Sequence, residues 1–222
     1  MALGSNPNKS FLIILGVILI QIVILSVCFG PVNISVSQIF DMFFYKLGFY
    51  DSKESFTVIH ESVFFDIRIP RVLMGILVGL GLGSSGAILQ GLFRNPLVDP
   101  GFIGVSSGAA VGAMVAIMFV PFIAITWLLP FTLPILSMLG AFITTIIIYR
   151  ISKVSKKTNI MVMLLSGIAI NALAGSIIGL LVTFASDSEL RDFTFWSLGG
   201  LYRANWMVVG ISAFFIISSF LI

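Results

Sequence analysis

Long apolar runs separated by short polar segments make up most of the chain. The run Val72–Phe93 contains no charged residue, and its roughly 22 residues would extend about 33 Å as an α-helix, enough to cross a bilayer core of about 30 Å. The pattern predicts an all-α fold, a polytopic membrane helical bundle with about six membrane-crossing helices. The expected spans are Phe11–Phe29, Val72–Phe93, about Phe102–Val120, about Leu133–Tyr149, about Asn159–Phe184 and a last one that opens at Trp206 and runs to Ile222.

Two shorter helices are expected outside these spans. Val36–Leu47 has an amphipathic pattern, typical of a helix that lies at the membrane interface. Ser186 and Glu189 have the spacing of a capping box, which predicts a helix start and a short helix over Glu189–Leu198. The rest of the segment between residues 31 and 71 is expected to be loop.

Composition supports a membrane protein. Of the 222 residues, 59% are hydrophobic and 9% are charged, with a mean hydropathy of +1.16, whereas a soluble domain has about 25% charged residues. We therefore expect a single transmembrane domain over residues 1–222, surrounded by membrane lipid. The net charge of +3 is too small to indicate nucleic-acid binding.

Few residues could carry out chemistry. Cys28 and His60 are each the only residue of their type, so an internal disulfide is impossible, and we expect no metal site and no cofactor. By the boundaries above, no span interior holds an ionisable residue, which argues against a proton relay, although Na⁺ coupling through carbonyl and hydroxyl groups stays open. The chain has no Gly-Lys dipeptide and thus no phosphate loop. We expect that it is not an enzyme and that any ATP hydrolysis occurs in another subunit.

Small residues recur at every fourth position in two successive spans. In lipid, helices associate through close backbone approach, which such spacing permits. Between the two stripes lies RNPLVDPG, a polar turn with two prolines that a lipid-facing helix could not contain. We expect the two spans to form a tightly packed hairpin. The stripes are Gly75, Gly79, Gly83, Ala87 and Gly91, then Gly104, Gly108, Gly112 and Ala116.

A basic cluster predicts the orientation. The segment RISKVSKK, between the fourth and fifth spans, holds Arg150, Lys153, Lys156 and Lys157. Short basic loops remain in the cytoplasm. Counting back along the chain, the N-terminus and the turn that begins at Arg94 are then also cytoplasmic.

Two blocks of sequence resemble one known family. RIPR, followed by SGAILQGLFRNPLVDPGFIGVSSGAAVGA, is similar to the signature of the permease subunits of the iron-chelate and vitamin B12 ABC importers. A looser block, Leu164–Leu201, resembles the same family at the matching distance downstream. Members have about ten helices, so this chain looks like the front part of such a permease, C-terminally incomplete, with the ATPase-docking segment lying beyond Ile222.

The resemblance also implies partners and a location. The partners would be ATP-binding cassette ATPase subunits, a periplasmic or lipid-anchored substrate-binding protein, and a second permease copy as a homodimer or close homologue. The location would be the bacterial inner membrane, as a multi-pass protein.

The resemblance assigns roles to two sets of residues. Arg68 and Arg71 would dock the binding protein, since guanidinium groups pair well with carboxylates; the alternative is that they are interfacial anchors. Asn95, Pro96 and Leu97 would close the inner end of the pathway as a cytoplasmic gate, and the alternative is a simple rigid turn. Thr158 and Asn159, at the start of the fifth span, are further candidates for this gate.

Polar side chains within the spans are candidates for lining the pathway. In the family the fifth helix lines it, which favours Asn171 and Thr183, and Gln90 is a third candidate. The alternative is that such groups bond to neighbouring helices, at roughly 0.6 kcal/mol each. The aromatic residues of Glu189–Leu198 would form either an interface belt or part of a short outer helix beside the external mouth.

We therefore predict a permease subunit of a binding-protein-dependent ABC importer. It would translocate an iron chelate (siderophore or haem) or cobalamin by ATP-driven alternating access. The alternative is a secondary transporter or channel that acts alone.

Overall fold

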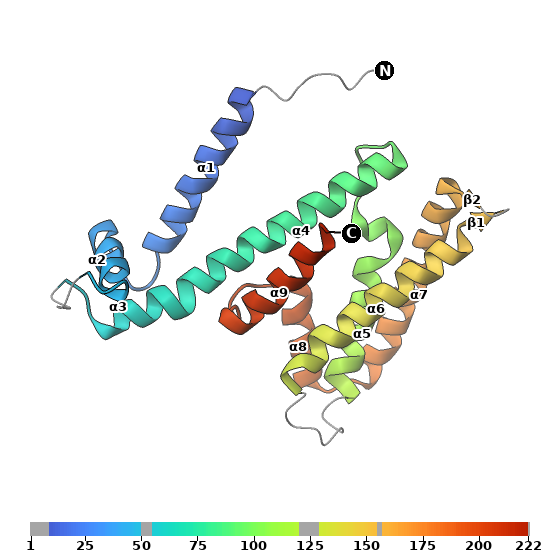
Figure 1. The fold of residues 1–222 in the computed structure, drawn as a ribbon. Helices are drawn as coiled ribbons and strands as arrows, with labels where there is room; N and C mark the ends of the chain where they lie inside the picture. Colours follow the sequence, from blue (N-terminus) through green and yellow to red (C-terminus); the bar gives the residue numbers. More distant parts are fainter. Residues whose placement is uncertain (1–8, 50–54, 120–128, 155–156, 222) are drawn as a thin grey trace. The chain divides into compact units, whose positions relative to one another are not determined.

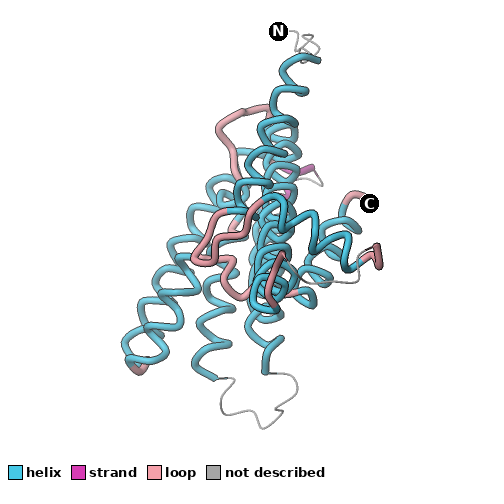
Figure 2. The backbone as a smooth tube through the Cα atoms, turned by 90° about the vertical axis from the view of Figure 1, so that its left-hand side faces the viewer, coloured by secondary structure: helices cyan, strands magenta, loops and turns pink. Residues whose placement is uncertain are grey.

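The computed structural model describes residues 9–49, 55–119, 129–154 and 157–221, and most of them are helical (Figures 1 and 2). The ends of two expected spans, Val120 and Ile222, lie outside the described residues. The helices are α1 (Lys9–Cys28), α2 (Val36–Lys46), α3 (Val58–Ser62), the π-helix η1 (Val63–Arg68), α4 (Ile69–Phe93), the 3₁₀ turn η2 (Pro100–Ile103), α5 (Val105–Phe119), α6 (Leu129–Ile151), α7 (Ile160–Phe184), α8 (Asp187–Leu198) and α9 (Trp206–Ser219). A short antiparallel ribbon of two strands, β1 (Lys153–Val154) and β2 (Lys157–Thr158), joins α6 to α7.

The membrane-helix prediction is confirmed. Within the described residues, four helical stretches are long and apolar enough to cross a bilayer, and α5 and α9 are shorter apolar helices. The four are Lys9–Cys28, Val58–Phe93, Phe131–Ile151 and Ile160–Phe184. The short helices predicted over Val36–Leu47 and Glu189–Leu198 are present as α2 and α8.

The expectation of loop up to residue 71 is wrong for its second half. Thr57 caps α3, its side chain accepting a hydrogen bond from the amide of His60, and helix then continues through η1 into α4. The sequence predicted that this span begins at Val72, because Arg71 is the last charged residue before the apolar run. The longer helix carries Asp66, Arg68 and Arg71 in its first part, and the run from Val72 to Phe93 stays uncharged.

The chain divides into two compact units, residues 1–81 with 201–222, and residues 82–200. In the first unit, α2 packs on η1 through the buried side chains of Met42, Phe64 and Phe65. In η1 the Ile69 amide bonds to the Phe64 carbonyl, and Pro70 has no N–H to offer Phe65. The Phe65 carbonyl instead accepts a hydrogen bond from the Trp206 indole N–H at 3.0 Å. The start of α9 is thereby held to η1.

In the second unit, α5, α6 and α7 lie side by side (Figure 1). A Cβ atom on Gly108 would overlap the carbonyl oxygen of Gly140, and one on Gly112 would overlap that of Leu136. The stripe of α5 therefore lets two backbones touch, but its partner is α6. The hairpin expectation had paired this stripe with α4, and the structure corrects that pairing because α6 presents a small residue, Gly140, at the crossing.

Replacing Gly112 by Ala should separate α5 from α6. The added methyl group would overlap the Leu136 backbone, and overpacking of this kind costs about 1–3 kcal/mol. We expect the melting temperature of the detergent-solubilised protein to fall by several degrees. Gly179→Ala is the matched control, because a Cβ at Gly179 meets no described atom within 4 Å; equal shifts in the two variants would contradict the close α5–α6 contact.

The start of α8 forms the predicted capping box. Ser186 accepts a hydrogen bond from the Glu189 amide, and the Glu189 carboxylate accepts one from the Ser186 amide at 2.7 Å. The hydrogen bonds from the Ser186 backbone and then from its side chain lower the pKa of Glu189. Because this helix is outside the apolar spans, its cap works in a polar setting.

Candidate functional site

The turn that follows α4, residues 94–101, contains the predicted gate and ends in the first residues of η2. The α4 helix ends in a Schellman arrangement, with Arg94 left-handed (φ +50°) and the Asn95 amide bonded to the Gln90 carbonyl at 3.2 Å. The Asn95 side chain then accepts a hydrogen bond from the Leu97 amide at 3.0 Å. Leu97 is 82% exposed at the tip, whereas Val98 is buried. The turn thus presents one apolar side chain outward from a tightly hydrogen-bonded loop.

The second half of the turn is closed by Asp99. Its carboxylate accepts a hydrogen bond from the Gly101 amide at 2.6 Å and caps η2, which Pro100 begins. Gly104 ends η2 with φ +75°, a conformation that favours glycine, and its carbonyl accepts a hydrogen bond from the Thr144 hydroxyl at 2.9 Å. That carbonyl also accepts the Gly108 amide at 2.9 Å, and the single Thr144 hydrogen is shared with the Gly140 and Ala141 carbonyls of its own helix, so α6 adds a second contact to a group that is already bonded.

Asn171 of α7 binds this segment from the other side. Its Nδ2 donates to the Gly101 carbonyl at 3.1 Å, and its Oδ1 accepts from the Ser107 hydroxyl at 2.6 Å. Together with Asp99, Phe102 and Ser106, these residues line a depression of about 270 Å³. Asn171 is a predicted pathway-lining residue, and both polar atoms of its side chain thus have hydrogen-bond partners within the chain.

The other predicted pathway residues are exposed. Thr183 donates to the Gly179 carbonyl of its own helix, and the Gln90 side chain on α4 is exposed. At the start of α7, Asn159 caps the helix by accepting hydrogen bonds from the amides of Met161 and Val162. The buried side chains of Val98 and Met163 belong to one cluster, which brings the turn and the first residues of α7 to the same end of this unit.

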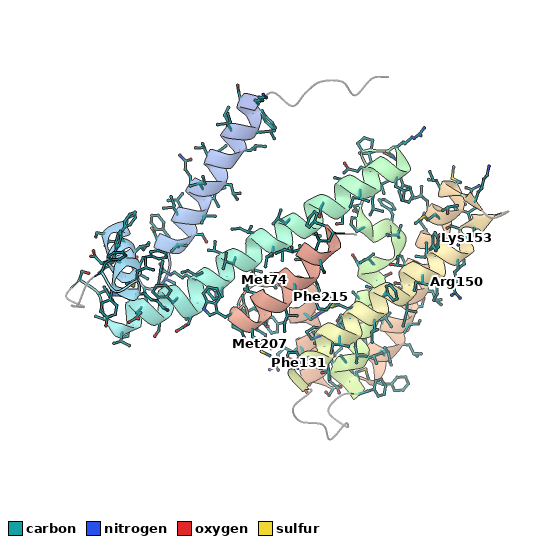
Figure 3. All side chains as sticks on the ribbon, viewed as in Figure 1. Met74, Phe131, Arg150, Lys153, Met207 and Phe215 are labelled. Carbon is teal, nitrogen blue, oxygen red and sulfur yellow. The ribbon has the colours of Figure 1, made fainter. Side chains whose placement is uncertain are left out.

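The basic residues after α6 lie at that end too. Figure 3 labels Arg150 and Lys153 at the end of α6 that leads into the β-ribbon, and the Lys153 ammonium lies 4.5 Å from the centre of the Tyr149 ring. Aromatic and basic side chains together are typical of a helix end at a membrane interface.

The two predicted docking arginines have different surroundings. Arg68 is buried, and its guanidinium donates hydrogen bonds to the carbonyls of Val27, Cys28 and Val32, just where α1 ends. Arg68 therefore satisfies backbone groups at the end of α1. Arg71 is exposed, so it is the accessible member of the pair.

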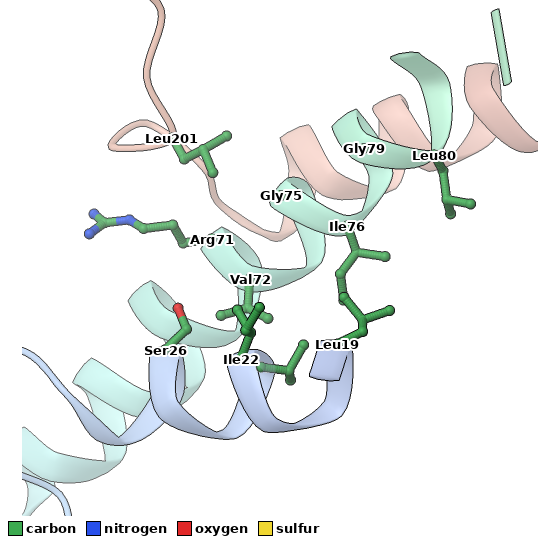
Figure 4. Close-up of a pocket in the computed structure, with 11 residues that line it drawn as sticks. Leu19, Ile22, Ser26, Arg71, Val72, Gly75, Ile76, Gly79, Leu80 and Leu201 are labelled. Carbon is green, nitrogen blue, oxygen red and sulfur yellow. The ribbon is translucent and has the colours of Figure 1, made fainter. Parts of the chain in front are cut away.

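Arg71 lies at the edge of an apolar pocket of about 790 Å³ within the first unit (Figure 4). Leu19 and Ile22 of α1 and Val72 and Ile76 of α4 line it. A Cβ atom added to Gly75 would lie 3.5 Å from the Leu201 side chain, which is an ordinary contact. Cβ atoms added to Gly79, Gly83 and Gly91 would have no described atom within 4 Å. The exposed Ala87 continues this open face of α4.

Several important residues were not found from the sequence. Thr144 of α6 and Gly167 of α7 contact the segment after the turn, and Gly140 of α6 contacts Gly108 of α5. Gly140 and Thr144 have the i, i+4 spacing that could have indicated a packing face. Among the described residues no group of three or more His, Cys, Asp and Glu side chains is close enough to hold a metal ion.

Replacing Arg68 should destabilise the protein, whereas replacing Arg71 should not. Arg68→Leu leaves three carbonyl groups without their donor, and an unsatisfied buried polar group costs about 1–3 kcal/mol. We expect a clear loss in thermal stability in detergent, measured by intrinsic fluorescence. Arg71→Leu, the matched control at an exposed position, should stay within about 0.5 kcal/mol of the wild type; the same loss in both variants would show that Arg68 has no special structural role.

Comparison with known proteins identifies the family of this chain. The FecCD transport family matches residues 11–222. The chain belongs to the FecCD transport family.

Relatives within this family are permeases. The chain is 41% identical over 160 residues to the hemin transport system permease protein HmuU of Yersinia pestis, which covers 68% of this chain and 45% of that protein. It is 30% identical over 211 residues to the vitamin B12 import system permease protein BtuC of Shigella boydii, covering 93% of this chain and 58% of that protein. The FecCD chain thus spans about half the length of the curated relatives it matches.

A solved structure agrees with the fold. It is described as an inward-facing conformation of a metal-chelate type ABC transporter, and it matches with a TM-score of 0.74 and 28% sequence identity, over 96% of this chain and 61% of that one. The family expected from RIPR and the SGAILQGLFRNPLVDPGFIGVSSGAAVGA block is therefore confirmed.

Proposed function

We propose that this FecCD chain is a permease subunit of a binding-protein-dependent ABC importer for an iron chelate (siderophore or haem) or cobalamin. The observation that carries the proposal is the family match over residues 11–222, together with relatives named for hemin and vitamin B12 transport. The described spans, with few charged side chains, suit the passage of a large chelate that is held weakly. ATP hydrolysis is assigned to a separate cassette subunit.

In this proposal the turn at Asn95, Pro96 and Leu97 is the cytoplasmic gate. Its rigid hydrogen bonding and the exposed Leu97 at its tip support the assignment. A second permease copy would contribute the same turn from across a central pathway, and Gln90 and Thr183 are the exposed pathway-lining candidates. The N-terminus would lie in the cytoplasm of a bacterial cell, on the same side as the basic residues after α6.

Uptake in proteoliposomes tests this function. The full importer, with its ATPase and binding protein, should take up radiolabelled haemin, an iron–siderophore complex or cobalamin only when ATP is inside the vesicles with the cassette subunits. Alternating access driven by ATP requires both partners. Uptake that persists without the ATPase would instead support a transporter or channel that acts alone.

Arg71 is proposed to dock the substrate-binding protein, because it is the exposed arginine of the predicted pair. Arg71→Glu should slow the association of the binding protein and make it less dependent on salt, since exposed charges act mainly on the on-rate. Surface plasmon resonance at two ionic strengths measures this. Arg203→Glu, an exposed arginine in the segment before α9, is the control, and an on-rate unchanged by Arg71→Glu would remove the docking role.

A further inference from the structure

One face of α7 follows the segment after the turn for two helical turns. Met163, Gly167 and Asn171 are four residues apart, so they lie along the same side of the helix. Each meets a successive part of the chain between Val98 and Ser107. The contact is therefore a continuous seam.

The seam is close at every point. The buried side chain of Met163 is in one cluster with Val98 and Ile103. A Cβ on Gly167 would overlap the carbonyl oxygen of Phe102, so the two backbones touch there. Because an added methyl group has no room at this point, α7 cannot slide along the segment without separating from it.

Asn171 supplies the directional part of the seam. Its two polar atoms bond to residues on either side of Gly104, which separates η2 from α5. The amide nitrogen donates to the Gly101 carbonyl, and the amide oxygen accepts from the Ser107 hydroxyl. The Ser107 hydroxyl has one hydrogen and two acceptors in reach, Asn171 at 2.6 Å and the Gly104 carbonyl at 3.2 Å. The shorter contact is the one to α7, so the bond between helices is the preferred one.

The turn itself has little freedom to bend. Asn95 and Asp99 each bond to the amide two residues further on, and Pro96 and Pro100 fix their own φ angles. A segment that is rigid inside and joined along its flank to a helix moves with that helix.

We propose that Asn171 is a positioning residue that clamps the turn at residues 94–101 to α7, so that displacement of α7 during the transport cycle moves Leu97. The inference rests on the proposed function, in which this turn is the gate. In this inference α7 moves the gate in addition to lining the pathway.

The test uses the complete importer with its ATPase and binding protein. Asn171→Leu keeps the size of the side chain and removes both hydrogen bonds, and Ser107→Ala removes one of them. We expect roughly five-fold or more loss of substrate uptake for each ATP hydrolysed in Asn171→Leu, with substrate-stimulated hydrolysis retained and a smaller loss in Ser107→Ala. Ser176→Ala is the control, since within the described part of the chain that hydroxyl bonds to Ala172 of its own helix, and it should keep the wild-type ratio.

An unchanged ratio of uptake to hydrolysis in Asn171→Leu would overturn the clamp. A cysteine pair keeps the idea testable if that variant does not assemble. In a Cys28→Ser background, the reduced Ser107→Cys, Asn171→Cys variant lacks the clamp and should show the low ratio of uptake to hydrolysis. A disulfide between the two cysteines should raise that ratio toward the wild-type value, because it joins the same parts again, and a ratio that stays low after oxidation would overturn the clamp. Oxidation that stops transport reversibly would show that the turn must move relative to α7.

The two proposals fail differently. If the wild-type importer shows no ATP-dependent uptake, the proposed function is wrong. If the wild type transports and only the coupling result is missing, the clamp alone is wrong.

Discussion

The structure depends on one constraint, which is that backbone polar groups at breaks between apolar helices must be satisfied from within the protein. Lipid offers no hydrogen-bond partner, and each unsatisfied group costs several kcal/mol. Two breaks in the described chain, one after α1 and one after α4, are bonded to distant side chains in the same way. Arg68 bonds to the carbonyls where α1 ends, Thr144 bonds to Gly104, and Asn171 bonds to Gly101. In each case the donor is about 40 to 70 residues away in sequence.

This arrangement links irregular segments to distant helices. The segment after α4 cannot be a free loop, because its carbonyl groups are held by α6 on one side and α7 on the other. The close approach of α5 to α6 at Gly108 and Gly140 keeps the donors at hydrogen-bonding distance. Packing and polar satisfaction therefore depend on each other, and the position of the proposed gate follows from both.

The sequence was informative where a pattern is local. Apolar runs located the membrane-spanning helices to within a few residues, and the spacing of Ser186 and Glu189 located α8. The charged residues before Val72 were misleading, because the partners of Arg68 are at the end of α1 and no local pattern reveals them. The spacing of the glycines in α5 indicated a close helix contact, but spacing within one helix does not show which helix is the partner. The roles predicted for Asn95, Pro96 and Leu97 came from the family resemblance and stay predictions.

Infrared spectroscopy of a single labelled carbonyl tests the central claim most directly. A ¹³C label on the Gly101 carbonyl, in the protein reconstituted in lipid, reports whether that group accepts a hydrogen bond. The Gly101 carbonyl accepts hydrogen bonds from both the Gly104 amide and Asn171. We therefore expect a band that moves part of the way to higher wavenumber in Asn171→Leu, where one of the two bonds is lost, and that stays in place in Ser176→Ala. A band at the same position in all three proteins would contradict it.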